Sequence, residues 1–411
     1  MTTSELQDGR ARQNRMAVAR VAGAGAISLA VGMGIGRFAF TPILPMMLHD
    51  GVLDLGFGSW LATANYAGYL AGAALCMLVP RLWPTATLVK AGLGATILLT
   101  FGMVWHAPAL WPAMRFLAGV ASAVAFVYTS EWCLRRLGEL GAPAIGALIF
   151  TGPGAGIALS GIVAMAAVAT GQSSRLTWLI FGILAACLSA AIWPVFSGRG
   201  ATPSADRPVQ PRLAACEGQA SMAEMVMLTL AYGLAGFGYI ITATYLPVMA
   251  RAALPASVWL DVFWPIFGVA SVAGCVCTTR VPRSVDPRLA LAACFALQAV
   301  GVLASLLVPT LMGFVAGSAF VGFPLTVIAF FTMQDARRLQ PETSARFIGL
   351  LTAVYGVGQI LGPLLVGFLL TGTADHDRGF SVSLWTATSA LAAGGALVLL
   401  MRRWWPRPEA R

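Results

Sequence analysis

Two arginines lie inside long apolar stretches of the sequence, where a cation needs a partner. Arg37 is in VGMGIGRFAFTPILPMM (31–47), and Arg115 begins RFLAGVASA (115–123), with no acidic residue within ten positions of either one. A guanidinium in an apolar solvent is costly unless it faces protein or water. In a water-filled cavity such a cation can attract an anionic group or hold a proton-conducting network, so both arginines are candidate binding residues.

Other polar side chains are expected at the same depth. If the first span ends near Pro45, Arg37 lies about 10 Å below the outer interface, and helical rise puts Arg115, Asn65 and Tyr66 at a similar level. Polar tips that would also need a partner in lipid extend this set of cavity candidates to Tyr69, Tyr239, Tyr355 and Gln359.

Two alternatives remain open for the arginines. Arg37 could extend toward the outer headgroups or bond to helix carbonyls. Arg115 could have a purely structural role of the same kind.

No acidic residue lies in the middle of a predicted span. Glu131 lies three residues from the inner end of its span, and Asp261 lies five residues inside the outer end of another. A carboxylate whose pKa responds to access from one side can couple transport to protons. Glu131, Asp261 and Arg115 are therefore candidates for coupling or gating, although both carboxylates could simply be interfacial charges in contact with water.

Enzyme and cofactor motifs are absent from the sequence. It has no G-x-x-x-x-G-K-[ST] and no H-E-x-x-H, and no His and acidic cluster falls within an apolar stretch. We expect no cofactor, no metal and no catalytic residue. The seven cysteines avoid the predicted outer loops, so no disulfide framework is expected.

The elements that position these residues are membrane spans. Of the 411 residues, 58% are hydrophobic and 10% are charged, and the mean hydropathy is +0.80. Apolar stretches of about 20 residues can each cross the hydrocarbon core as a helix. We predict an all-α integral membrane protein with twelve spans, near 21–47, 57–79, 86–106, 108–133, 143–169, 175–196, 223–249, 256–279, 288–308, 310–334, 346–370 and 380–401.

The net charge of +10 follows from topology. With the N-terminus inside, 21 of the 26 basic residues fall on the cytoplasmic side and three on the outer side. This imbalance predicts a multi-pass protein of the cell inner membrane with both termini in the cytoplasm. The basic residues would meet anionic membrane lipid, so no nucleic-acid partner is expected.

The chain repeats itself. A shift of 202 residues places Gly34, Gly36 and Pro45 on Gly236, Gly238 and Pro247, and puts Tyr239 at the position of Arg37. Six spans followed by six more form a parallel repeat. We predict a six-helix half over 1–196, a polar cytoplasmic linker over 197–222 and a second half over 223–411.

These features resemble the major facilitator superfamily. The stretches GMGIGRFAFTPILP, NYAGYLAG (65–72) and GQILGP (358–363) resemble its YbfB/YjiJ-type branch, and RFLAGVASA resembles its helix 4 motif. GPGAGIALSG (152–161) partly resembles the helix 5 motif of exporters. The resemblance implies a monomeric carrier whose helices 1, 4, 7 and 10 line a central cavity.

Small residues spaced by four would pack helices closely and could let them rock. Proline inside a span can kink it. The expected packing and hinge residues are Gly32, Gly36, Gly68, Gly72, Gly152, Pro153, Gly156, Gly358, Gly362 and Pro363.

The sequence thus predicts a secondary active transporter that moves a small organic solute by alternating access. Proton coupling is the expected source of energy, and export is favoured by the helix 5 resemblance, with uptake as the open alternative. The alternative is a membrane receptor or scaffold that uses a carrier fold without transport.

Overall fold

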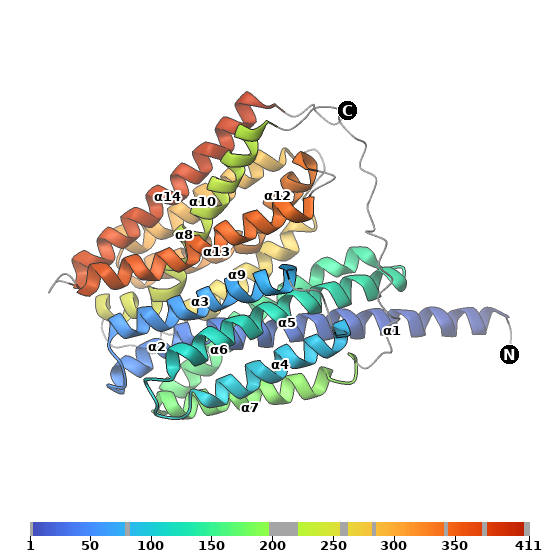
Figure 1. Cartoon of the computed structure of the whole chain (residues 1–411), viewed down its shortest axis with the longest axis horizontal. Coiled ribbons are helices and arrows are strands. Elements are labelled where there is room, and N and C mark those ends of the chain that lie inside the picture. Colours follow the sequence, from blue (N-terminus) through green and yellow to red (C-terminus); the bar gives the residue numbers. More distant parts are fainter. Residues whose placement is uncertain are drawn as a thin grey trace.

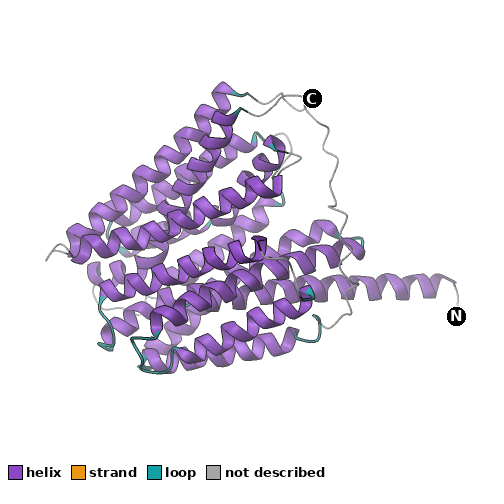
Figure 2. Ribbon diagram, viewed as in Figure 1, coloured by secondary structure: helices purple, strands orange, loops and turns teal. Residues whose placement is uncertain are grey.

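The computed structural model describes residues 3–78, 83–196, 221–254, 262–281, 285–340, 344–371 and 376–406. Within these ranges every regular element is a helix (Figure 2), which confirms the predicted all-helical fold. The first elements are α1 (Thr3–Leu29), the π-helix η1 (Ala30–Phe38), α2 (Phe40–His49), α3 (Leu55–Leu78), α4 (Thr85–Gly102), α5 (Trp111–Glu139), the 3-10 helix η2 (Pro143–Phe150), α6 (Thr151–Ala169) and α7 (Ser174–Ile192). They are followed by α8 (Met222–Ala253), α9 (Phe263–Thr278), α10 (Pro287–Leu307), α11 (Leu311–Gly322), α12 (Pro324–Leu339), α13 (Ser344–Thr371) and α14 (His376–Trp404).

Eleven helical segments of the described chain are long and apolar enough to cross a membrane. Helix α9 is apolar but has only 16 residues, and its predicted span at 256–279 begins among residues outside the described ranges. The structure therefore supports a multi-pass membrane protein, while the twelfth span stays a prediction. The predicted linker also lies outside the described ranges, apart from Ser221 and Met222.

The first span is longer than expected and changes helical form midway. α1 leads into η1, and α2 then continues through Pro45 as far as His49. The expectation of an end near Pro45 is wrong, because proline removes only one backbone donor and the last turn is still closed by the Asp50 N–H on the Met46 carbonyl at 2.8 Å. About 18 Å of helix therefore separates Arg37 from the C-terminal end of α2 at His49.

Short side chains fix where several later helices begin. The Ser173 hydroxyl accepts from the Leu176 N–H before α7, and the Thr310 hydroxyl accepts from the Gly313 N–H before α11, both at 3.3 Å. Each bond satisfies one of the backbone donors that a helix start leaves open.

The helices form two groups in space (Figure 1). The elements from α1 to α7 lie together, and α8 packs with α13 and α14 in a second group that includes α10. The groups meet where α3 packs on α13 and where α6 packs on α9. Their ribbons diverge toward the end of the molecule that carries both termini (Figure 1). A buried layer at this junction holds most of the candidate residues.

Candidate functional site

Arg37 projects from η1 into the junction between the two helix groups. Its Nη2 donates to Oε1 of Gln359 on α13 at 2.6 Å, and the two side chains are 3% and 2% exposed. Because a guanidinium only donates, the amide oxygen of Gln359 must face Arg37. The amide nitrogen then donates to the hydroxyl of Tyr239 on α8. Three residues chosen separately from the sequence thus form one hydrogen-bonded chain.

Aromatic rings surround the Arg37 guanidinium. Its Cζ lies 4.1 Å from the ring centroid of Tyr69, 5.0 Å from that of Tyr66 and 5.1 Å from that of Phe38. Ring faces attract a cation and offset part of the cost of burying it.

A stack of tyrosines continues the layer on the second helix group. The ring of Tyr355 stacks on Tyr232 with centroids 4.5 Å apart, and on Tyr239 with centroids 5.8 Å apart. Tyr355 is only partly buried, whereas Tyr239 is 2% exposed. The stack therefore extends the layer from Tyr239 through Tyr355 to Tyr232, which is 5% exposed.

Arg115 is bound to backbone. Its Nη2 donates to the Arg37 carbonyl at 3.0 Å and its Nη1 to the Gly36 carbonyl at 3.4 Å. These carbonyls lie where η1 ends, next to the change of helical form. The geometry favours the structural alternative for Arg115, because its side chain holds the segment from which Arg37 projects.

Asn65 and Tyr66 are neighbours with different contacts. The Asn65 amide donates to the Arg115 carbonyl at 2.9 Å and so ties α3 to α5. The Tyr66 hydroxyl instead bonds to the hydroxyl of Thr244 on α8 at 3.1 Å. Tyr66 therefore forms a second polar bridge between the groups, and Thr244 is a member of the layer that sequence reasoning missed.

The layer carries positive charge without a carboxylate partner. Among the described residues, no salt bridge joins an acid to Arg37 or Arg115. The Nε atoms of both arginines are buried without a hydrogen-bond partner. A buried guanidinium with an unused donor is a site at which a further acceptor would be stabilised.

The two predicted coupling carboxylates lie elsewhere. Glu131 is partly buried toward the C-terminal end of α5, where it accepts from the Thr85 hydroxyl at 3.5 Å. Asp261 lies outside the described residues.

The predicted glycines lie at close backbone contacts, mostly within one helix group. A Cβ on Gly72 would lie 2.8 Å from Cα of Val120, and a Cβ on Gly156 would lie 2.8 Å from Cα of Gly34. A Cβ on Gly358 would lie 2.8 Å from the Phe237 nitrogen on α8. Atoms also lie within 3.0 Å of the Cβ positions of Gly32, Gly36, Gly68, Gly152 and Gly362. Pro153 is in the first turn of α6, and Pro363 is inside α13.

One close glycine contact between the two helix groups involves other residues. A Cβ on Gly268 of α9 would lie 2.6 Å from the carbonyl oxygen of Gly154 and 2.7 Å from Cα of Ala158, both on α6. The indole nitrogen of Trp264 donates to the Ser160 hydroxyl at 3.2 Å across the same contact. GPGAGIALSG contains Gly154, but the sequence does not show which of its glycines faces the other half.

A buried ion cluster lies at the start of α10. Arg288 pairs with Asp335 at 2.9 Å and with Glu224, and its Nη1 donates to the Met401 and Trp405 carbonyls at 3.0 Å. It joins the ends of α8, α10, α12 and α14. The sequence shows these residues as charges at cytoplasmic helix ends and gives no sign that they meet.

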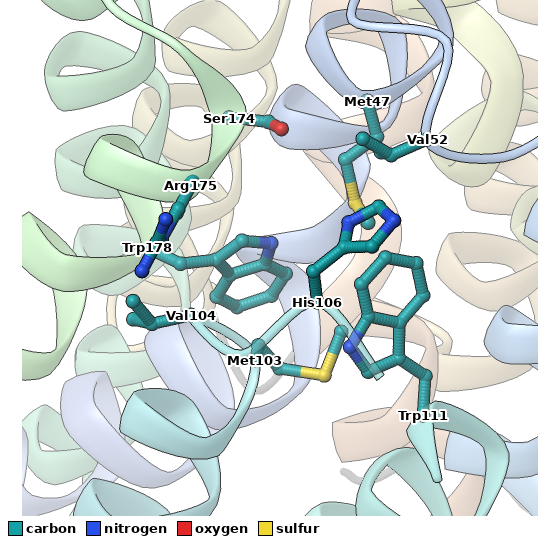
Figure 3. Close-up of a pocket in the computed structure, with 9 residues that line it drawn as sticks. All are labelled: Met47, Val52, Met103, Val104, His106, Trp111, Ser174, Arg175 and Trp178. Atoms are coloured by element: carbon teal, nitrogen blue, oxygen red, sulfur yellow. The ribbon is translucent and has the colours of Figure 1, made fainter. Parts of the chain in front are cut away.

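A small pocket lies away from the Arg37 layer, near the C-terminal ends of α2 and α4 and the N-terminal ends of α5 and α7 (Figure 3). His106, Trp111 and Trp178 line it together with Met47 and Met103. Its cavity of about 30 Å³ holds a water or two, too little for an organic solute. Among the residues that the structure describes, no three His, Cys, Asp or Glu side chains lie together in a way that could hold a metal ion.

A comparison with protein families decides the class of the protein. The family described as "Uncharacterised MFS-type transporter YbfB" matches residues 29–401. The chain belongs to this family. Membership confirms the resemblance to the YbfB branch of the major facilitator superfamily (MFS) and, together with the membrane helices, supports a transporter. A search of curated proteins finds no match.

Proposed function

We propose that this YbfB-family protein is a secondary active transporter that moves a small organic solute by alternating access around the Arg37 layer. The observation that carries the proposal is the buried bond from Arg37 to Gln359, which joins the two helix groups through polar atoms. A static packing contact would be satisfied by apolar side chains at lower desolvation cost. A polar bridge instead suits a contact that must break and meet water or solute.

In this proposal each helix group contributes six of the predicted twelve spans. The two groups rock against each other as units. The contact of α6 with α9 supports rocking, because Gly154 and Gly268 present smooth backbone to each other. The bonds from Arg37 to Gln359 and from Tyr66 to Thr244 would break when the outer side opens.

Energy would come from the proton gradient across the inner membrane. Both termini would lie in the cytoplasm, and the protein would act as a monomer. Glu131 supports proton coupling because it is a partly buried carboxylate near the proposed inner end of α5. Asp261 is the corresponding candidate near the outer end. The partial helix 5 resemblance at 152–161 favours export.

Flux measurements test the proposal without assuming the charge of the solute. Purified protein is reconstituted into proteoliposomes with a pH gradient, and the accumulation of benzenesulfonate, mannitol and phenyltrimethylammonium is followed over time. A carrier accumulates at least one of them saturably and above protein-free liposomes. Ligand binding without accumulation of any probe would favour the receptor alternative instead.

The same assay tests coupling through Glu131. Glu131→Gln removes the titrating proton but keeps the shape and the acceptor for Thr85. Accumulation driven by the pH gradient should fall about tenfold or more, while exchange without a gradient persists. Equal loss of both activities would contradict a coupling role.

A further inference from the structure

The charge balance around Arg37 indicates what kind of solute the layer receives. The carboxylates that form salt bridges in the described chain do so with His49, Arg135, Arg136, Arg288 and Arg402. Arg115 is compensated by two backbone carbonyls. Arg37 has one neutral amide oxygen and ring faces, which leave its charge unpaired.

The geometry of the guanidinium is more specific than its charge. Nε and Nη2 lie on the same edge of an arginine side chain, where a carboxylate binds through two parallel bonds. Here Nη2 donates to Gln359 Oε1, and Nε is buried without a partner. An amide has one oxygen and can fill only half of this edge. A carboxylate has two oxygens and fills all of it.

The side chains around this edge indicate the chemistry of the rest of the ligand. Tyr69, Tyr66 and Phe38 present rings to the guanidinium at 4.1–5.1 Å. Such walls favour an apolar or aromatic body and penalise a small, strongly hydrated ion. Because Arg37 carries one unpaired positive charge, a ligand with a single negative charge would balance it.

We propose that the solute is an organic monoanion whose carboxylate binds the Nε and Nη2 edge of Arg37 in place of the amide oxygen of Gln359. This assignment rests on the proposed carrier function and names its substrate class. Binding would replace the bond between η1 and α13 by a bond to the solute, so the ligand itself releases one link between the two helix groups.

The test uses three probes of nearly equal shape and different charge: benzoate, benzamide and benzamidinium. Melting of the purified protein is followed at constant ionic strength, because a ligand that binds the native state raises the melting temperature. Benzoate should raise it by about 3 °C or more at saturation, whereas benzamide and benzamidinium should not. Sodium sulfate is the control for simple anion binding and should have no effect.

Two variants locate the effect. Arg37→Gln should abolish the benzoate shift, whereas Arg402→Gln, which removes the same charge from an exposed helix end, should keep it. If Arg37→Gln does not fold, Gln359→Glu decides, because a carboxylate placed beside Arg37 would fill the edge. Gln359→Glu should melt higher without ligand and no longer respond to benzoate.

The proposal is overturned if benzamide or benzamidinium stabilises as well as benzoate, if sulfate does so, if benzoate has no effect, or if the shift persists in Gln359→Glu. These outcomes leave the carrier function standing as long as any flux probe accumulates. Benzoate is added to the flux probes, and failure of all of them to accumulate would remove the carrier function even if benzoate binds.

Discussion

The guanidinium of Arg115 donates to the backbone carbonyl of Arg37 at 3.0 Å, so one buried arginine holds the segment from which the other projects. Both side chains are almost fully buried, at 2% and 3% exposed. Their roles nevertheless differ, because Arg115 satisfies backbone and Arg37 faces across the junction to Gln359.

Arg115→Met should destabilise the protein more than Arg37→Gln does. It leaves the carbonyls of Gly36 and Arg37 without these donors in a buried place, which costs about 1–3 kcal/mol. Arg37→Gln keeps a polar partner for Gln359. Thermal melting in detergent measures the stability of both variants. The assignment of roles would be contradicted if Arg37→Gln were the less stable variant.

Gly268→Ala should block transport. Its new Cβ would lie 2.7 Å from Cα of Ala158 and would force α9 away from α6. We expect the flux to fall about tenfold or more, since close backbone approach is what lets these helices pack. The matched control is Gly94→Ala, where nothing lies within 4 Å of the Cβ position. Normal flux in both variants would mean that the α6–α9 contact does not move.

Arg288→Met should be strongly destabilising, because it leaves Glu224 and Asp335 buried without their shared cation. Breaking such a pair costs about 3–5 kcal/mol. Adding Glu224→Gln and Asp335→Asn to the same chain should restore much of the stability. Arg402→Gln, in an exposed pair with Asp286, should cost no more than about 1 kcal/mol. Melting temperatures of the wild type, Arg288→Met, the triple variant and Arg402→Gln compare these effects. A small loss of stability in Arg288→Met would contradict a stabilising role for the cluster.

Tyr66→Phe should weaken outer closure slightly. It removes the hydroxyl that bonds to Thr244 across the junction and keeps the ring over Arg37. A neutral bond is worth about 0.5–1.5 kcal/mol, so the outward-open population should rise by about two- to tenfold. The thiol-labelling assay described below measures that population, and an unchanged rate would exclude this bond from the closure.

The sequence predicts an all-helical membrane protein because apolar length is a local signal. It indicates membrane helices without knowledge of packing, and the residues predicted for the layer, such as Arg37, Tyr239 and Gln359, do meet. The depth of Arg37 was misjudged because Pro45 does not end its helix.

The contacts that define roles could not be predicted in this way. Whether Arg115 faces a carbonyl or a cavity depends on the shape of η1, and no sequence pattern specifies a π-helix over nine residues. The Arg288 cluster likewise gathers residues from four helix ends. Its members look like ordinary interfacial charges until the second helix group is assembled.

The most direct test of the central claim is the labelling of Ser59→Cys from the outside. Ser59 is 3% exposed near the N-terminal end of α3, which the proposed topology puts outside, and a Cβ on Gly367 of α13 would lie 3.2 Å from its Cβ. In a cysteine-free chain in right-side-out vesicles, an impermeant maleimide reaches this position only when the outer side opens. Ser305→Cys is the matched control, because Ser305 is equally buried near the C-terminal end of α10, also outside in the proposed topology, and packs on Gly317 within one group.

We expect Ser59→Cys to be labelled slowly and Ser305→Cys not at all. Gln359→Leu removes the bond from Arg37, and a hydrogen bond to a charged group contributes about 1.5–3 kcal/mol, so labelling of Ser59→Cys should become about 10- to 100-fold faster. If Ser59→Cys stays as protected as Ser305→Cys, with and without Gln359→Leu, the two groups do not part at the Arg37 layer and the alternating-access account is wrong.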